Sequence, residues 1–121
     1  MAKEIDERLF RFACRAVDVF GLLNEAGGAG REIARQYLRA ATAIGANAAE
    51  AAAGQSKADF VAKLAISRKE CREVLFWLRL IDAKCLLPKG TVSADLDEAR
   101  QLAAILSAIV RSAQSSARRG P

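Results

Sequence analysis

Apolar residues recur along most of this chain at alternating spacings of three and four, and the clearest series lies in its middle. That series consists of Phe60, Leu64, Ser67, Cys71, Val74, Leu78, Ile81 and Cys85. An α-helix has about 3.6 residues per turn, so this spacing keeps every member of the series on one side of a helix. We therefore predict a helix over residues 57–85, roughly 45 Å long at about 1.5 Å per residue, that packs through this seam.

The same kind of pattern predicts three further helices, over residues 3–26, 31–53 and 94–114. Glycines near residues 27–30 and at Gly54 separate the first three, because glycine caps a helix without a Cβ penalty. Ser56 and Ser93 are favourable N-caps for the last two, and residues 115–121 are expected to fray. Short connections make successive helices antiparallel neighbours. We predict an all-α, antiparallel up-down-up-down four-helix bundle, with residues 1–121 forming a single domain.

Two helices carry more apolar surface than one seam requires. The third helix has a second stripe with Ile66 and Leu80 at its ends, and the first has a second set formed by Phe10, Ala13 and Val17. A wide intramolecular core is one interpretation, and burial against other copies of the chain is the one we slightly favour. Two sets of residues would then fix the interface or its register: Glu70, Glu73 and Trp77 within the second stripe of the third helix, and Asn47 and Glu50 on the inward side of the second helix.

Composition excludes several kinds of chemistry. The chain has no histidine, which excludes histidine-dependent triads, His-ligated zinc and the Glu-x-x-His motif of di-iron bundles. Asn47 with Glu50 as a ligand site, or Glu70 with Glu73 as paired catalytic carboxylates, would lack partners. The Gly28-Ala29-Gly30 segment lacks the rest of a phosphate-binding loop. We expect a noncatalytic protein without metal or cofactor.

The cysteines and the charged start of the chain bear on location. The three cysteines, Cys14, Cys71 and Cys85, lack C-x-x-C spacing and lie within helical apolar patterns, which predicts buried free thiols in a reducing compartment. Lys3, Glu4, Asp6, Glu7 and Arg8 are charged, at positions where a signal peptide would need an apolar region. The longest uncharged stretches, residues 40–49 and 101–110, are much shorter than the ~20 residues that span a bilayer. We expect a cytoplasmic protein with no membrane association.

Arginines give the chain a formal net charge of +5 and are arranged in rows along three predicted helices. Guanidinium groups one helical turn apart can contact successive phosphates, which makes these rows candidates for nucleic-acid binding. The alternative is that the rows are ordinary solvated faces with ion pairs such as Glu4 with Arg8. The candidate residues are Arg8, Arg11, Arg15, Arg31, Arg35, Arg39, Arg68 and Arg72.

Several separate blocks in the two central helices resemble a known family. They are Gln36, Arg39-Ala40, Ile44-Gly45-Ala46-Asn47, Glu50, Ser56, Ala58-Asp59-Phe60, Lys63-Leu64, Glu70, Glu73 and Trp77-Leu78. This pattern resembles bacterial four-helix bundle proteins related to the intervening-sequence proteins encoded inside some large-subunit ribosomal RNA genes. With its basic balance and its Phe76-Trp77-Leu78-Arg79 segment, the chain is also distantly similar to the accessory variability determinant proteins of diversity-generating retroelements.

The resemblance implies an antiparallel bundle that assembles into a ring, a homopentamer, with no established catalytic residues. The distant relatives resemble RNA-binding rings. We therefore expect a ring-forming homo-oligomer whose arginine rows bind structured RNA or a ribonucleoprotein. The alternative is a protein-interaction scaffold with no nucleic-acid role, which docks a partner through its surplus apolar surface.

Overall fold

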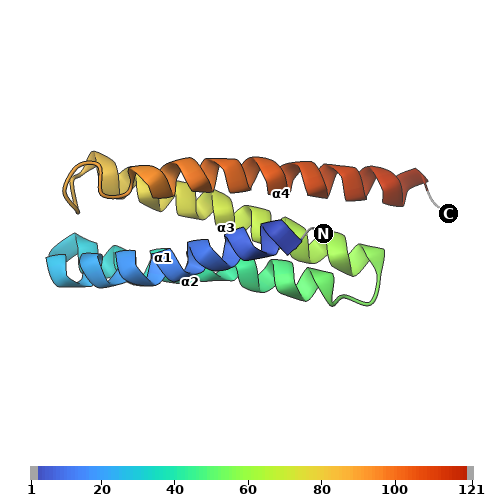
Figure 1. Ribbon diagram of the computed structural model, residues 1–121, viewed down its shortest axis with the longest axis horizontal. Coiled ribbons are helices and arrows are strands. Elements are labelled where there is room, and N and C mark those ends of the chain that lie inside the picture. Colours follow the sequence, from blue (N-terminus) through green and yellow to red (C-terminus); the bar gives the residue numbers. More distant parts are fainter. Residues whose placement is uncertain (1–2, 120–121) are drawn as a thin grey trace.

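The computed structural model describes residues 3–119 of the chain, and side chains within residues 4–116. Four helices follow one another: α1 (Lys3–Ala26), α2 (Gly28–Ala52), α3 (Lys57–Ala83) and α4 (Ser93–Arg119). Each runs antiparallel to the one before it (Figure 1). The predicted all-α, up-down-up-down four-helix bundle is confirmed.

The predicted seam of α3 forms the centre of the core, except at its two ends. Its six inner members, Leu64 through Ile81, are fully buried. Phe60 is partly exposed, and Cys85 is exposed and lies beyond the end of α3. The prediction that Cys85 belongs to the seam was therefore wrong. The chain leaves the helix in a Schellman-type turn, in which Cys85 has φ 50° and Leu86 N donates to Ile81 O at 3.0 Å.

Two other helix boundaries differ from the predicted ones. Helix α2 begins at Gly28, three residues before the predicted start at 31, because Gly27 and Gly28 reverse the chain with φ of 74° and 54°. Helix α4 continues to Arg119, so the predicted fraying is wrong for residues 115–119. The sequence holds no glycine or proline between Ser93 and Gly120 that would end it earlier. Residues 120–121 lie outside the described part of the chain.

The predicted cap of α3 is present. Ser56 has an extended backbone, and its Oγ accepts a hydrogen bond from the Asp59 backbone N at 3.0 Å. This bond satisfies one of the amide groups that a helix start leaves without a partner. The α2–α3 connection is thereby fixed within four residues.

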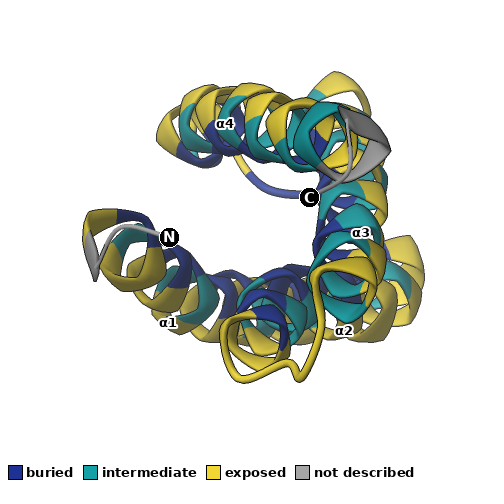
Figure 2. Cartoon of the chain, turned by 90° about the vertical axis from the view of Figure 1, so that its right-hand side faces the viewer, coloured by how far each residue is buried: buried dark blue, intermediate teal, exposed yellow. Residues whose placement is uncertain are grey.

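The four helices do not pack on each other equally. Consecutive helices lie against one another along much of their length, whereas α1 and α4 make few close backbone contacts. Viewed end-on, the ribbons form an open C with α1 and α4 at its two ends and the buried residues on its inner side (Figure 2). Apolar side chains such as Phe12 of α1 and Leu102 of α4 fill the interior. The fourth side of the bundle is therefore closed by side chains.

None of the helices, over the residues described, is both long enough and apolar enough to cross a lipid bilayer.

Candidate nucleic-acid interface

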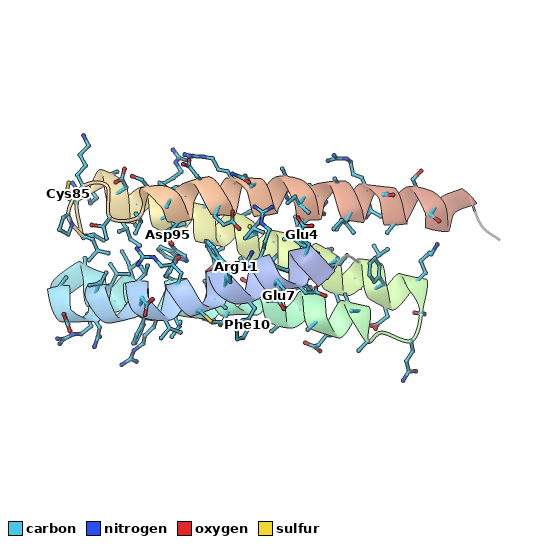
Figure 3. The ribbon with its side chains drawn as sticks, viewed as in Figure 1. Glu4, Glu7, Phe10, Arg11, Cys85 and Asp95 are labelled. Atoms are coloured by element: carbon cyan, nitrogen blue, oxygen red, sulfur yellow. The ribbon has the colours of Figure 1, made fainter. Side chains whose placement is uncertain are left out.

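Arg8 and Arg15 of α1 point across the open side of the bundle to α4. The Arg8 guanidinium donates to both carboxylate oxygens of Glu98, at 3.0 and 2.7 Å. Arg15 Nε donates to both oxygens of Asp95, at 3.1 and 3.3 Å, and its Nη2 donates to the Thr91 carbonyl oxygen at 3.1 Å. Figure 3 shows Asp95 on α4, on the side that faces α1. Hydrogen bonds to these carboxylates raise the pKa of both arginines. The positive charge of each arginine is therefore paired with a carboxylate of its own chain.

Arg39 of α2 is also committed to an internal network. Its Nη1 donates to Glu70 Oε2 at 3.1 Å, and its Nη2 donates to Glu73 Oε2. Glu73 accepts a second hydrogen bond from Trp77 Nε1 at 3.0 Å. The Trp77 hydrogen bond and then Arg39 lower the pKa of Glu73. This network lies at the α2–α3 contact. It joins Arg39 to three residues that we predicted at an interface between copies, namely Glu70, Glu73 and Trp77.

The other five candidate arginines have no such partner. Arg11, Arg31, Arg35 and Arg72 are exposed and Arg68 is partly exposed. Within the part of the chain that the structure describes, none of them forms an ion pair or a side-chain hydrogen bond. They are distributed over α1, α2 and α3. The structure thus divides the eight predicted arginines into three that bind carboxylates of their own chain and five that face solvent.

Asn47 and Glu50 lie in the second half of α2. The Asn47 side-chain amide donates to the carbonyl oxygen of Ala43 in its own helix at 2.9 Å. Glu50 is exposed and pairs with Lys63 of α3, with 3.4 Å between Nζ and Oε1. Glu50 and Lys63 line a cavity of about 520 Å³ at the α2–α3 connection together with Gln55, Ser56 and Asp59, and Asn47 is not part of that lining.

An apolar groove runs along the outer contact of α1 and α2. It has a volume of about 500 Å³ and is lined by Asp6, Leu9, Phe10, Ala13, Thr42, Gly45, Ala46, Ala49 and Ala52. The second apolar set of α1 borders this side of the molecule, where Phe10 is 67% and Val17 56% exposed. In Figure 3, Phe10 lies on the side of α1 away from α4. The groove exists because the α2 residues that line it are small and do not fill the space beside the Phe10 ring.

The acidic and cysteine side chains are the ones that could support metal or thiol chemistry. Among the described residues, no group of three or more His, Cys, Asp or Glu side chains comes together as metal ligands would. The three cysteines are free, and their predicted burial is confirmed for Cys71. It is wrong for Cys14, which lies outside the buried stripe of α1, and for Cys85, which lies beyond the end of α3. Burial raises the pKa of the Cys71 thiol to about 12, so this thiol is not a nucleophile at neutral pH.

Sequence reasoning missed three residues that matter for this surface. Asp95 and Glu98 do not stand out in the sequence pattern, yet they determine which arginines are available. Phe76, 57% exposed beside Trp77, was noted only as part of a motif. A usable signal was present for the carboxylates. Arg8 and Arg15 are seven residues apart, and each stands next to a buried residue of α1, Leu9 or Ala16. Side chains at such positions can pair with a neighbouring helix.

Comparison with known proteins agrees with this architecture. The family model described as 23S rRNA-intervening sequence protein matches residues 9–108. Among solved structures, a protein with unknown function from the S23 ribosomal protein family of Bacteroides thetaiotaomicron VPI-5482 superposes with a TM-score of 0.79. It is 28% identical in sequence, and the match covers 88% of this chain and 97% of that one. No curated protein gives a significant match. The resemblance predicted from the sequence is confirmed, and the chain belongs to the 23S rRNA-intervening sequence protein family.

Proposed function

We propose that this protein is a noncatalytic, ring-forming bundle that binds structured RNA, alone or within a ribonucleoprotein, through its exposed arginines. The observation that carries the proposal is the set of five arginines without a carboxylate partner, Arg11, Arg31, Arg35, Arg68 and Arg72. A solvated guanidinium can bind a phosphate through two parallel hydrogen bonds without first breaking an ion pair. The net charge of +5 supports the same class of partner.

The proposal leaves out Arg8, Arg15 and Arg39. A phosphate that bound one of them would separate it from a carboxylate of the same chain. The carboxylates concerned include Asp95 and Glu70, which are 5% and 9% exposed and would be left with their charge uncompensated. The RNA-binding arginines are therefore a subset of those in the sequence pattern.

The test replaces Arg31 and Arg35 together by Gln and leaves Arg39 in place, so that the α2–α3 network stays intact. A matched control replaces two exposed lysines of the α3–α4 connection, Lys84 and Lys89, by Gln, which removes the same charge. Affinity for a labelled structured RNA is measured by fluorescence anisotropy over a range of salt concentrations. Each lost phosphate contact should flatten the slope of log K against log salt by about 0.7–0.9. If the variant without Arg31 and Arg35 has the same affinity and the same salt slope as the lysine control, these two arginines do not contact RNA.

Self-association is the second part of the proposal. It is supported by the exposed Phe10 ring and the exposed Val17 side chain on the groove side of α1, because contiguous apolar surface of this kind usually marks an interface. Sedimentation velocity of the purified chain would show a discrete oligomer, which Phe10→Asp should dissociate. A chain that sediments as a monomer at every concentration tested would refute this part.

The groove also favours the second candidate function, a scaffold that docks another protein. RNase treatment separates the two functions. A partner retained by the immobilised protein after RNase treatment, together with no RNA affinity at low salt, would support the scaffold and contradict the RNA proposal.

A further inference from the structure

Phe76 is an apolar side chain that the fold leaves in solvent, although it lies in the C-terminal half of α3, the helix whose other face forms the central seam. It is 57% exposed, and the buried residues of α3 lie on the opposite side of that helix. Arg72 precedes it by four residues and Arg79 follows it by three, so all three share one face of α3. Arg68 continues this row by one further turn. Over the described residues, none of these three arginines forms an ion pair.

The Phe76 ring is held by its neighbours. Its centroid lies 5.2 Å from that of the Trp77 ring, with the two planes at 72° to each other. Trp77 is in turn fixed by its hydrogen bond to Glu73, and Glu73 by Arg39 of α2. The lowered pKa of Glu73 keeps this carboxylate charged at neutral pH, so the network persists there. An exposed aromatic ring supported in this way presents a flat face that is already in position.

The residues around Phe76 indicate what that face fits. Arg72 and Arg79 are separated by about 10 Å along the helix axis, at ~1.5 Å per residue, with the ring between them. An apolar protein surface placed here would desolvate these guanidinium groups without offering them a counter-charge, which is unfavourable. A nucleotide supplies both an aromatic face and a phosphate. In an A-form duplex the base faces are already stacked on each other, whereas an unpaired base is free to stack on an aromatic side chain.

We propose that Phe76 stacks on an unpaired RNA base, while Arg72 and Arg79 contact the phosphates on either side of that base. This inference rests on the proposed RNA binding and specifies its substrate. The preferred ligand is RNA with single-stranded loops or bulges, and the fully paired helix is a poorer one. Arg31 and Arg35 on α2 then add sequence-independent phosphate contacts.

The chain contains a control for the loss of an exposed apolar side chain. Leu22 of α1 is 40% exposed and does not line the α1–α2 groove. The residues one turn away from it are Asp18, Val19, Glu25 and Ala26, none of which is basic. Replacing Leu22 therefore removes exposed apolar surface that has no flanking guanidinium groups.

The experiment compares two labelled RNAs, a hairpin with an adenosine-rich unpaired loop and a fully paired duplex with the same number of phosphates. We expect Phe76→Ala to weaken hairpin binding by about 5- to 150-fold, the range found for loss of one stacked base. Duplex binding should be unchanged in this variant. Phe76→Trp should restore hairpin binding, and Leu22→Ala should leave it as in the wild type.

Trp77 supplies a direct optical readout, because it is the only tryptophan in the chain and touches Phe76. The fluorescence of Trp77 should change when the hairpin binds to the wild type or to Leu22→Ala, and much less when it binds to Phe76→Ala. Because unfolding would also change this fluorescence, circular dichroism checks in parallel that each variant is folded. Phe76→Leu serves as a second variant, since it keeps an apolar side chain and removes only the flat ring.

The outcomes separate this inference from the proposed function. If Phe76→Ala and Phe76→Leu bind the hairpin with the same affinity as the wild type, base stacking is refuted. The proposed contacts between arginines and phosphates would not be affected by that result. Wild-type protein that binds neither RNA at low salt would overturn both. A changed sedimentation coefficient in Phe76→Ala, with unchanged RNA affinity, would show that this face packs against another copy and would also refute stacking.

Discussion

Arg39→Met should destabilise the bundle more than Glu70→Gln, although the two side chains are partners in one ion pair. The difference follows from their unequal burial: the Arg39 side chain is 52% exposed and that of Glu70 only 12%. Without Arg39, Glu70 keeps a largely buried charge and loses its counter-ion. Without the charge on Glu70, Arg39 still binds Glu73 and is hydrated on its exposed side.

The magnitudes can be estimated from these exposures. Removing one partner of a fully buried pair costs about 3–5 kcal/mol, because the other charge stays buried without compensation. Glu70 retains some contact with water, so we expect a loss of about 2–3 kcal/mol for Arg39→Met. Glu70→Gln keeps a hydrogen-bond acceptor beside an exposed guanidinium, and the expected loss is below about 1 kcal/mol.

Urea unfolding followed by circular dichroism measures both values. With an m-value of about 1–3 kcal/mol per molar, the Arg39→Met loss lowers the midpoint by roughly 0.7–3 M. The double variant Arg39→Met/Glu70→Gln should be more stable than Arg39→Met alone, because the stranded charge is gone. Equal losses for the two single variants, or a double variant no better than Arg39→Met, would show that burial of Glu70 does not control the energetics of this pair.

Three further predictions use the same protein. Leu78→Ala removes a fully buried side chain from the seam and should cost about 2–5 kcal/mol in urea unfolding. A thiol reagent should label Cys14 and Cys85 rapidly in the native protein and Cys71 only after unfolding, because burial raises the Cys71 pKa to about 12. The pKa of Glu73 is lowered in the fold, so its contribution to stability is present above its usual value of 4.5 and is lost as the pH falls through the folded-state value. The acid-induced loss of stability should therefore be smaller in Glu73→Gln, and identical pH profiles would contradict this assignment.

Much of the fold could be predicted because the apolar pattern is strong wherever the core is. The seam of α3 is buried from Leu64 to Ile81, and Ser56 caps the helix as its sequence position indicated. The pattern failed where no apolar contact sets the boundary. Cys85 has the right spacing for the seam, but the chain adopts a left-handed conformation at this non-glycine residue, and residue type does not reveal that.

The candidate site was less predictable, because arginine rows look alike whether or not their charges are satisfied. Because Glu4 precedes Arg8 by four residues, the sequence suggests an ion pair between the two. Arg8 instead binds Glu98, ninety residues away in the sequence. Only the packing of α1 across from α4 determines that choice. Arg31 and Arg35 follow the same spacing rule as Arg39, but only Arg39 has buried carboxylates within reach.

The way the bundle is closed has a consequence for how it folds. Nearly all close packing joins helices that are consecutive in the chain, so little loop entropy has to be lost before contacts form. Such local topology is typical of proteins that fold in microseconds to milliseconds. The bridges from α1 to α4 join residues 80 to 90 positions apart and should form after the three consecutive helix pairs. Substitutions at Arg15 should then accelerate unfolding and leave the folding rate nearly unchanged, whereas a matching fall in the folding rate would place this closure within the rate-limiting step.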